Sequence, residues 1–172
     1  MSKSKIVGIM ALIAFAVGIF LVGNAVAGEK HRLSTVYHMI KWEQMNVPGE
    51  EGHVIALWDA KGVIRNKDGK RFGEGVIIHT VGSFDWNMKA GIVLAHFYDE
   101  WTDRDGDKIY SKSESEGKLK IGEMGPFLEG RNTFTRGVGK YEGIRGGFTW
   151  RGYALPPDQS YADWDVEVEL PR

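Results

Sequence analysis

Alternation of apolar and polar residues recurs along this chain and is sharpest near its C-terminus. Four apolar residues, Trp164, Val166, Val168 and Leu170, alternate with four acidic ones, Asp163, Asp165, Glu167 and Glu169. Successive side chains of a β-strand point to opposite faces, so the pattern predicts an amphipathic strand with its acidic side in water. Beyond residue 28 no segment has a sustained apolar stripe of helical period. The fold class predicted is therefore all-β.

Seven further runs have strand-like patterns, at residues 33–45, 53–65, 75–81, 92–102, 108–121, 131–137 and 146–154. The run at 75–81 is largely apolar, which is typical of a strand covered on both faces. Turn signals separate the runs: Pro48-Gly49, Asp68-Gly69, Asp105-Gly106 and Pro156-Pro157. Asp-Gly between alternating runs predicts a type I′ hairpin. About eight antiparallel strands in an up-and-down barrel are expected, because closure removes exposed edges. A β-sandwich is the alternative, since periodicity does not separate the two.

The first 27 residues have the pattern of a signal peptide. Lys3 and Lys5 precede an uncharged run at residues 6–22, and Ala25-Val26-Ala27 supplies a small-x-small cleavage site. Cleavage after Ala27 would leave residues 28–172 as a single β-barrel domain. That domain would be located in the periplasm or secreted from the cell. The alternative is an uncleaved membrane anchor, since 17 apolar residues sit at the lower limit for a spanning helix.

Charge and cysteine content exclude several classes of function. The net charge is −1, which argues against a strongly basic nucleic-acid binder. Without any cysteine the chain has no disulfide scaffold, cysteine zinc site, iron–sulfur cluster or cysteine nucleophile. The five histidines show neither H-x-H nor H-E-x-x-H spacing. We therefore expect no metal, no cofactor and no nucleic-acid partner.

A glycine-rich stretch at residues 137–152, GVGKYEGIRGGFTWRG, is the most distinctive segment. It resembles the corresponding stretch of allene oxide cyclase-like and dirigent-like barrels. Gly52-His53, Gly73-Glu74 and the turn at 103–107 are similarly spaced in bacterial members of that group. The resemblance implies a small eight-stranded barrel of the calycin type with an apolar cavity, a lipophilic small-molecule ligand and a homodimer or homotrimer. It also implies a cyclase or isomerase that acts by confining a reactive intermediate.

The sharpest group of proton-handling residues lies in the run at 92–102. His96, Tyr98 and Glu100 share one strand face, about 7 Å apart from one to the next. If that face points inward, it lines a cavity with an imidazole, a phenol and a carboxylate. If it points outward, Phe97 and Trp101 pack inside. With His79, these three residues are the candidate catalytic acids and bases, because imidazole titrates near neutral pH.

Five residues are candidates for the wall of a ligand pocket: Trp58, Trp86, Arg136, Phe148 and Trp150. Aromatic walls suit lipophilic ligands, and the arginine could anchor an anion or a carbonyl. The alternatives are core packing for the aromatic residues and an ordinary surface charge for Arg136.

Alternate aspartates at 103, 105 and 107, with Glu114 further on, imitate an EF-hand calcium loop. The glycine that such a loop needs at its sixth position is here Lys108, and no helices are predicted on either side. A solvated hairpin turn is therefore the prediction, with weak calcium binding as the alternative.

The function that these observations favour is binding of a lipophilic small molecule in the barrel cavity, with cyclase or isomerase activity implied by the resemblance alone. One alternative is a non-catalytic carrier or sensor of the lipocalin kind. The other is a structural envelope protein whose barrel is filled by its own side chains.

Overall fold

The computed structural model describes residues 28–113, 115–118, 120–122, 125–155 and 158–170. The predictions made for residues 1–27, for Glu114 and for the Pro156-Pro157 turn lie outside this part of the chain. The described residues form ten strands, β1 Glu29–Asn46, β2 His53–Asn66, β3 Ile77–Asn87, β4 Ile92–Thr102, β5 Lys108–Ser113, β6 Ser115–Lys118, β7 Lys120–Gly122, β8 Gly125–Val138, β9 Arg145–Leu155 and β10 Gln159–Glu169.

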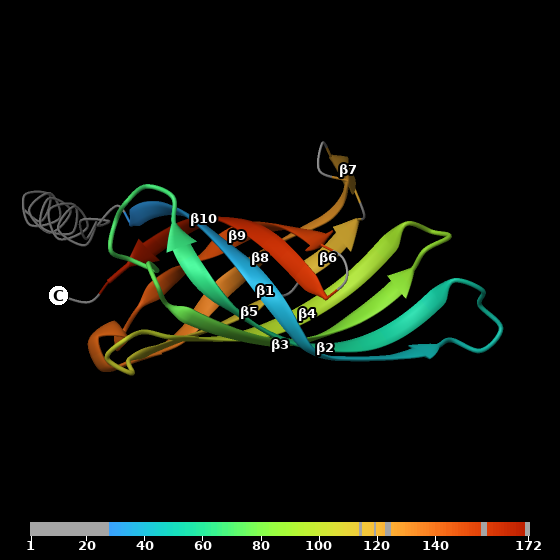
Figure 1. The fold of residues 1–172 in the computed structure, drawn as a ribbon, viewed down its shortest axis with the longest axis horizontal. Helices are drawn as coiled ribbons and strands as arrows, with labels where there is room; N and C mark the ends of the chain where they lie inside the picture. The colour runs from blue at the N-terminus through green and yellow to red at the C-terminus, as the bar shows by residue number, and fades with distance from the viewer. Residues whose placement is uncertain (1–27, 114, 119, 123–124, 156–157, 171–172) are drawn as a thin grey trace, which may run out of the picture.

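These strands close into an antiparallel barrel (Figure 1). Eight strands make the ring, in the order β1, β2, β3, β4, β5, β8, β9 and β10, and β10 returns to β1. The short β6 pairs with β4, and the short β7 pairs with β8. The predicted barrel is confirmed, and the β-sandwich alternative is wrong, because the β3–β4 pairing leaves one continuous sheet. No helix in the described part of the chain is long and apolar enough to cross a membrane.

The two ends of the barrel differ. At one end the loop between β2 and β3 inserts Phe72 and Val76 into the core, and the β8–β9 connection adds Tyr141 and Ile144. We call this the closed end. At the other end the β1–β2 and β3–β4 hairpins extend beyond the ring, as Figure 1 shows on its right. We call this end the mouth.

The core near the closed end is aromatic. Trp101 of β4 is 1% exposed and lies against the rings of Phe72, Phe134, Phe148 and Trp164. Large rings in mutual contact bury much apolar area, which is the dominant favourable contribution to folding. A cysteine-free chain of this length can rely on such a core for its stability.

The sequence run at 75–81 differs from its prediction in two ways. Gly75 has a φ of +71° and belongs to the preceding loop, whereas the strand continues to Asn87. Only the inward face of this strand is covered: Ile77 and Val81 on the outer face are 53% and 42% exposed. The prediction of cover on both faces is wrong for the single chain, because a barrel wall has only one buried side.

The two Asp-Gly turns also differ from the predicted type I′ hairpins. Asp105-Gly106 does join β4 to β5, but no described non-glycine residue has positive φ, so this is not a type I′ turn. Asp68-Gly69 opens the longer loop between β2 and β3.

The glycine-rich stretch forms the corner between β8 and β9, which contains a short 3-10 turn, Gly139–Tyr141. Gly139 has a φ of +67°, which favours glycine. A Cβ on Gly137 would fall 1.7 Å from the carbonyl oxygen of Tyr141. These glycines therefore let the chain turn tightly at the closed end.

Candidate functional site

A buried polar network crosses the middle of the barrel. The Asp99 carboxylate of β4 is its centre, and it accepts hydrogen bonds from Thr80 Oγ1 at 2.7 Å, Ser111 Oγ at 2.6 Å and Asn132 Nδ2 at 2.6 Å. Trp150 Nε1 donates to Asn132 Oδ1 at 2.8 Å, and the Tyr37 hydroxyl lies 3.3 Å from Thr80 Oγ1. Side chains from four strands thus meet at the carboxylate, and Trp150 and Tyr37 extend the network to β9 and β1.

The electrostatics of this network follow from its burial. Burial raises the pKa of the Asp99 carboxyl above its ordinary value, and the hydrogen bonds from Ser111, Thr80 and Asn132 partly offset that rise. Burial, together with the neighbouring Asp99, raises the pKa of the Tyr37 phenol well above its ordinary value. The partners of Asp99 among the described residues are neutral, so the network can hold a proton at a pH where an exposed carboxyl would lose it.

A layer of rings lies next to the Asp99 carboxylate on the side of the mouth. Phe97, two residues before Asp99 on β4, lies edge-on to Trp58 at 5.5 Å and to Trp150 at 5.6 Å, measured between ring centroids. Trp58 in turn contacts Tyr37 at 5.3 Å. The three rings of this layer, Phe97, Trp58 and Trp150, come from β4, β2 and β9.

On the mouth side of that layer the wall is apolar and half-buried. Phe84, Trp86 and Leu128 pack against the buried Val93 and Ala95 of β4. The Nε1 atom of Trp86 is buried and has no hydrogen-bond acceptor among the described residues. Buried indole N–H groups usually find a partner, so this unsatisfied donor is unusual.

The rim of the mouth is tied together by His53 at the start of β2. Its Nδ1 lies 2.6 Å from Glu50 Oε2 in the β1–β2 turn, and its Nε2 lies 2.6 Å from Asp85 Oδ1 of β3. Hydrogen bonds with Asp85 and Glu50 raise the pKa of the His53 imidazole. The backbone N–H of Met88 also donates to the Gly52 carbonyl at 2.9 Å.

The predicted catalytic residues lie on the outer wall. His96, Tyr98 and Glu100 point away from the interior, because Phe97, Asp99 and Trp101 occupy the inward positions of β4. Of the two orientations considered for this strand, the structure therefore has the outward one. These residues do not line the interior, and their catalytic roles stay predictions.

Glu100 and His79, both on the outer wall, each pair with a side chain of a neighbouring strand. Lys108 donates to Glu100 Oε1 at 2.8 Å, and this hydrogen bond lowers the pKa of Glu100. His79 Nε2 lies 2.8 Å from Asp59 Oδ1 on the neighbouring strand. His79 and Glu100 occupy paired positions of β3 and β4, so the structure brings them side by side.

The predicted ligand-wall residues divide between the two faces. Trp58, Trp86 and Trp150 face the interior near the mouth, and Phe148 is buried in the core towards the closed end. Arg136 lies on the outer wall, where its guanidinium stacks 4.3 Å above the ring of Tyr110. Arg136 therefore does not contribute to an interior wall.

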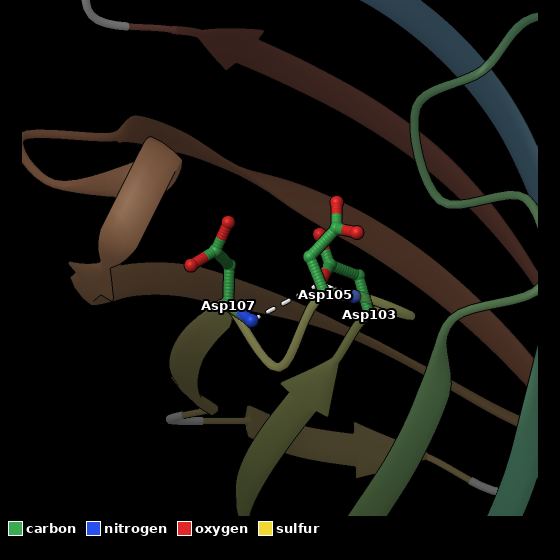
Figure 2. A group of neighbouring side chains, drawn as sticks. All are labelled: Asp103, Asp105 and Asp107. Carbon is green, nitrogen blue, oxygen red and sulfur yellow. Dashed lines mark hydrogen bonds between the residues drawn. The ribbon is translucent and has the colours of Figure 1, made fainter.

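Figure 2 shows the three aspartates of the β4–β5 turn. Asp103 Oδ1 accepts the backbone N–H groups of Asp105 and Asp107, which shapes the turn. The Lys140 ammonium lies 2.5 Å from Asp103 Oδ2 and 2.8 Å from Asp105 Oδ2. A cation among these carboxylates would compete with that lysine, in agreement with a hairpin turn instead of a calcium loop.

Asp99 was missed as a site residue, although its position carried a signal. It is the one charged residue on a strand face otherwise made of Val93, Ala95, Phe97 and Trp101. A carboxylate on an apolar face needs buried partners, and these came from strands distant in sequence.

The fold is that of the dirigent-like barrels. Two solved structures with this fold are the pterocarpan synthase dirigent proteins GePTS1 and PsPTS1. GePTS1 is 12% identical with a TM-score of 0.51, and the match covers 88% of this chain and 94% of that one. PsPTS1 is 10% identical with a TM-score of 0.52, covering 85% and 98%. No protein-family model and no curated protein sequence matches the chain.

Proposed function

We propose that the protein binds a lipophilic small molecule at the mouth of the barrel. The observation that carries this proposal is the half-buried apolar wall of Phe84, Trp86 and Leu128, with an indole N–H that has no acceptor in the described part of the chain. Ligand sites are typically apolar with a few convergent polar groups, and this wall has that composition.

In this proposal the ligand lies above the layer formed by Phe97, Trp58 and Trp150. The rings of that layer form the floor of the proposed site, and the Asp99 carboxyl lies beneath them. Cyclase or isomerase activity is the enzymatic form of the proposal, in which the wall confines a reactive intermediate. It is supported by the fold shared with proteins described as pterocarpan synthases. Without catalysis, the same ligand binding would make the protein a lipocalin-like carrier.

A structural protein with a filled barrel is the second candidate. The dense contacts of Trp101 with four other rings favour it, because they leave the closed half of the interior occupied. The two candidates differ in what they require at the mouth: only the first needs a saturable site there.

Titration with the fluorescent lipophilic probe N-phenylnaphthylamine distinguishes them. Saturable binding that is weakened about tenfold by Trp86→Ala, equivalent to about 1.4 kcal/mol, supports the ligand site. Tyr153→Ala is the matched control, since Tyr153 is an aromatic residue outside the mouth wall. Absence of saturable binding, or equal binding by both variants, would favour the filled barrel.

We also propose that residues 1–27 are a signal peptide and that the protein works in the periplasm or is secreted. Mass spectrometry of the native protein tests this: a mature N-terminus at Gly28 supports export with cleavage, whereas an intact Met1 supports the membrane anchor. Self-association as a homodimer or homotrimer belongs to the proposal too, and native mass spectrometry measures it.

A further inference from the structure

One wall of the barrel exposes far more apolar surface than the rest. Exposed large apolar side chains gather on β1–β4, and in the described chain outside these strands only Met88, Val138 and Leu170 are of this kind. On the outer face Val36, Val63 and Ile77 are cross-strand neighbours, as are Val81 and Tyr98. The outer face of β10, which adjoins β1, carries by contrast an acidic row. We call the outer face of β1–β4 the apolar wall.

Several charges on the apolar wall are paired within it. Lys41 Nζ lies 2.9 Å from Glu43 Oε1, and His79 Nε2 lies 2.8 Å from Asp59 Oδ1. Among the described residues Lys30 and Lys61 are left without a carboxylate partner, and two exposed lysines are a small excess of charge for a strongly charged partner such as nucleic acid or an anionic lipid surface. Its partner should instead be apolar and nearly neutral, and the apolar wall of a second copy has both properties.

The apolar wall also carries a projection and a hollow side by side. Tyr98 is 63% exposed and borders a groove of about 390 Å³. Leu57 and Val81 give the groove apolar sides, and Asp59, Ser83 and His96 supply polar groups. In a two-fold interface each surface meets its own copy, so a projection beside a hollow is self-complementary.

The dimensions of the wall suit a stable dimer. Four strands at about 4.8 Å spacing are about 19 Å wide, and strands of 11 residues, such as β3 and β4, are about 36 Å long. The resulting area of about 700 Å² is close to the roughly 800 Å² that each partner buries in a standard interface.

We propose that two copies of this chain associate through their apolar walls in a two-fold dimer, in which Tyr98 of each copy enters the groove of the other. The polar groups of the groove satisfy the buried phenol, and the exposed face of Ile77 and Val81 becomes covered. This inference rests on the proposed self-association and is independent of ligand binding at the mouth.

Native mass spectrometry and sedimentation of the purified protein test the proposal. We expect a dimer that Tyr98→Lys converts to monomer by removing the projection, and that Ser83→Arg also dissociates by filling the groove. Val138→Lys is the matched control, because Val138 is 44% exposed and lies outside the wall. Thermal melting of each variant shows whether the fold is retained.

The remaining outcomes overturn the inference. A monomeric wild type would contradict it together with the proposed self-association. A trimer, or a dimer that resists both Tyr98→Lys and Ser83→Arg, would contradict only the two-fold contact and leave self-association in place.

Discussion

Asn132 Nδ2 lies 2.6 Å from Asp99 Oδ2 and joins β8 to β4 across the intervening β5. The same amide offers its oxygen to Trp150 Nε1, so one side chain connects the buried carboxylate to a ring of the layer below the mouth. The Asp99 carboxyl is thereby connected to the ring layer beneath the candidate ligand site through two hydrogen bonds.

Replacing Asp99 with Asn should change how stability depends on pH. Burial raises the pKa of Asp99 above 3.8, so the folded state binds this proton more tightly than the unfolded chain does. The contribution of Asp99 to stability therefore falls as pH rises from 3.8 through its raised pKa. Urea unfolding across this range should show the difference between wild type and Asp99→Asn shrinking with increasing pH. Asp165→Asn, an exposed position on β10, is the control, and an identical trend in both variants would contradict the prediction.

Truncation of Trp101 should be the most damaging core substitution. Trp101→Ala leaves a cavity among four neighbouring rings, and such changes cost about 3–5 kcal/mol of unfolding free energy. Trp42→Ala should cost much less, because Trp42 is 37% exposed. Denaturant titration of the two variants measures both values, and equal losses would show that the closed-end core is not the main source of stability.

The rim of the mouth should loosen as pH rises. An imidazole can donate from both nitrogens only when protonated, and His53 faces a carboxylate on each side. Because the folded-state pKa of His53 is raised above 6.5, its stabilising effect is complete below pH 6.5 and is lost as pH passes through the raised value. The Tm difference between wild type and His53→Gln should therefore be larger at acidic than at alkaline pH. Glu50→Gln and Asp85→Asn should each reduce that pH dependence; a pH-independent difference would argue against it.

Calcium should leave the melting temperature of the wild-type protein unchanged, because the Lys140 ammonium already lies between the carboxylates of Asp103 and Asp105 and would have to be displaced. Hydrogen bonds with those two carboxylates raise the pKa of Lys140, so it stays charged throughout the neutral range. Lys140→Gln should lower the Tm by leaving the carboxylates to repel one another. Scanning calorimetry with and without millimolar calcium checks both statements, and a calcium-dependent rise in the wild-type Tm would refute the first.

The strands were predictable because alternation is a local property. The runs at 92–102 and near the C-terminus carry period-two patterns that coincide with β4 and β10. The extension of β3 to Asn87 was missed because residues 82–87 mix glycine, polar and aromatic residues without a regular pattern. Asp99 was visible only as an anomaly on an apolar face, since its partners Thr80, Ser111 and Asn132 lie on three other strands.

The sequence by itself determined that this chain forms strands, which residues share a face of each strand, and where glycine permits the sharp corner after β8. For β10 the acidic row also predicted the outward face, whereas only the tertiary structure decided which face of β4 points inward. That choice depends on barrel closure, which assigns Phe97, Asp99 and Trp101 to the interior and His96 and Tyr98 to the outside. Period-two alternation is symmetric between the two faces, so a strand with apolar residues on both sides carries no local information about its orientation.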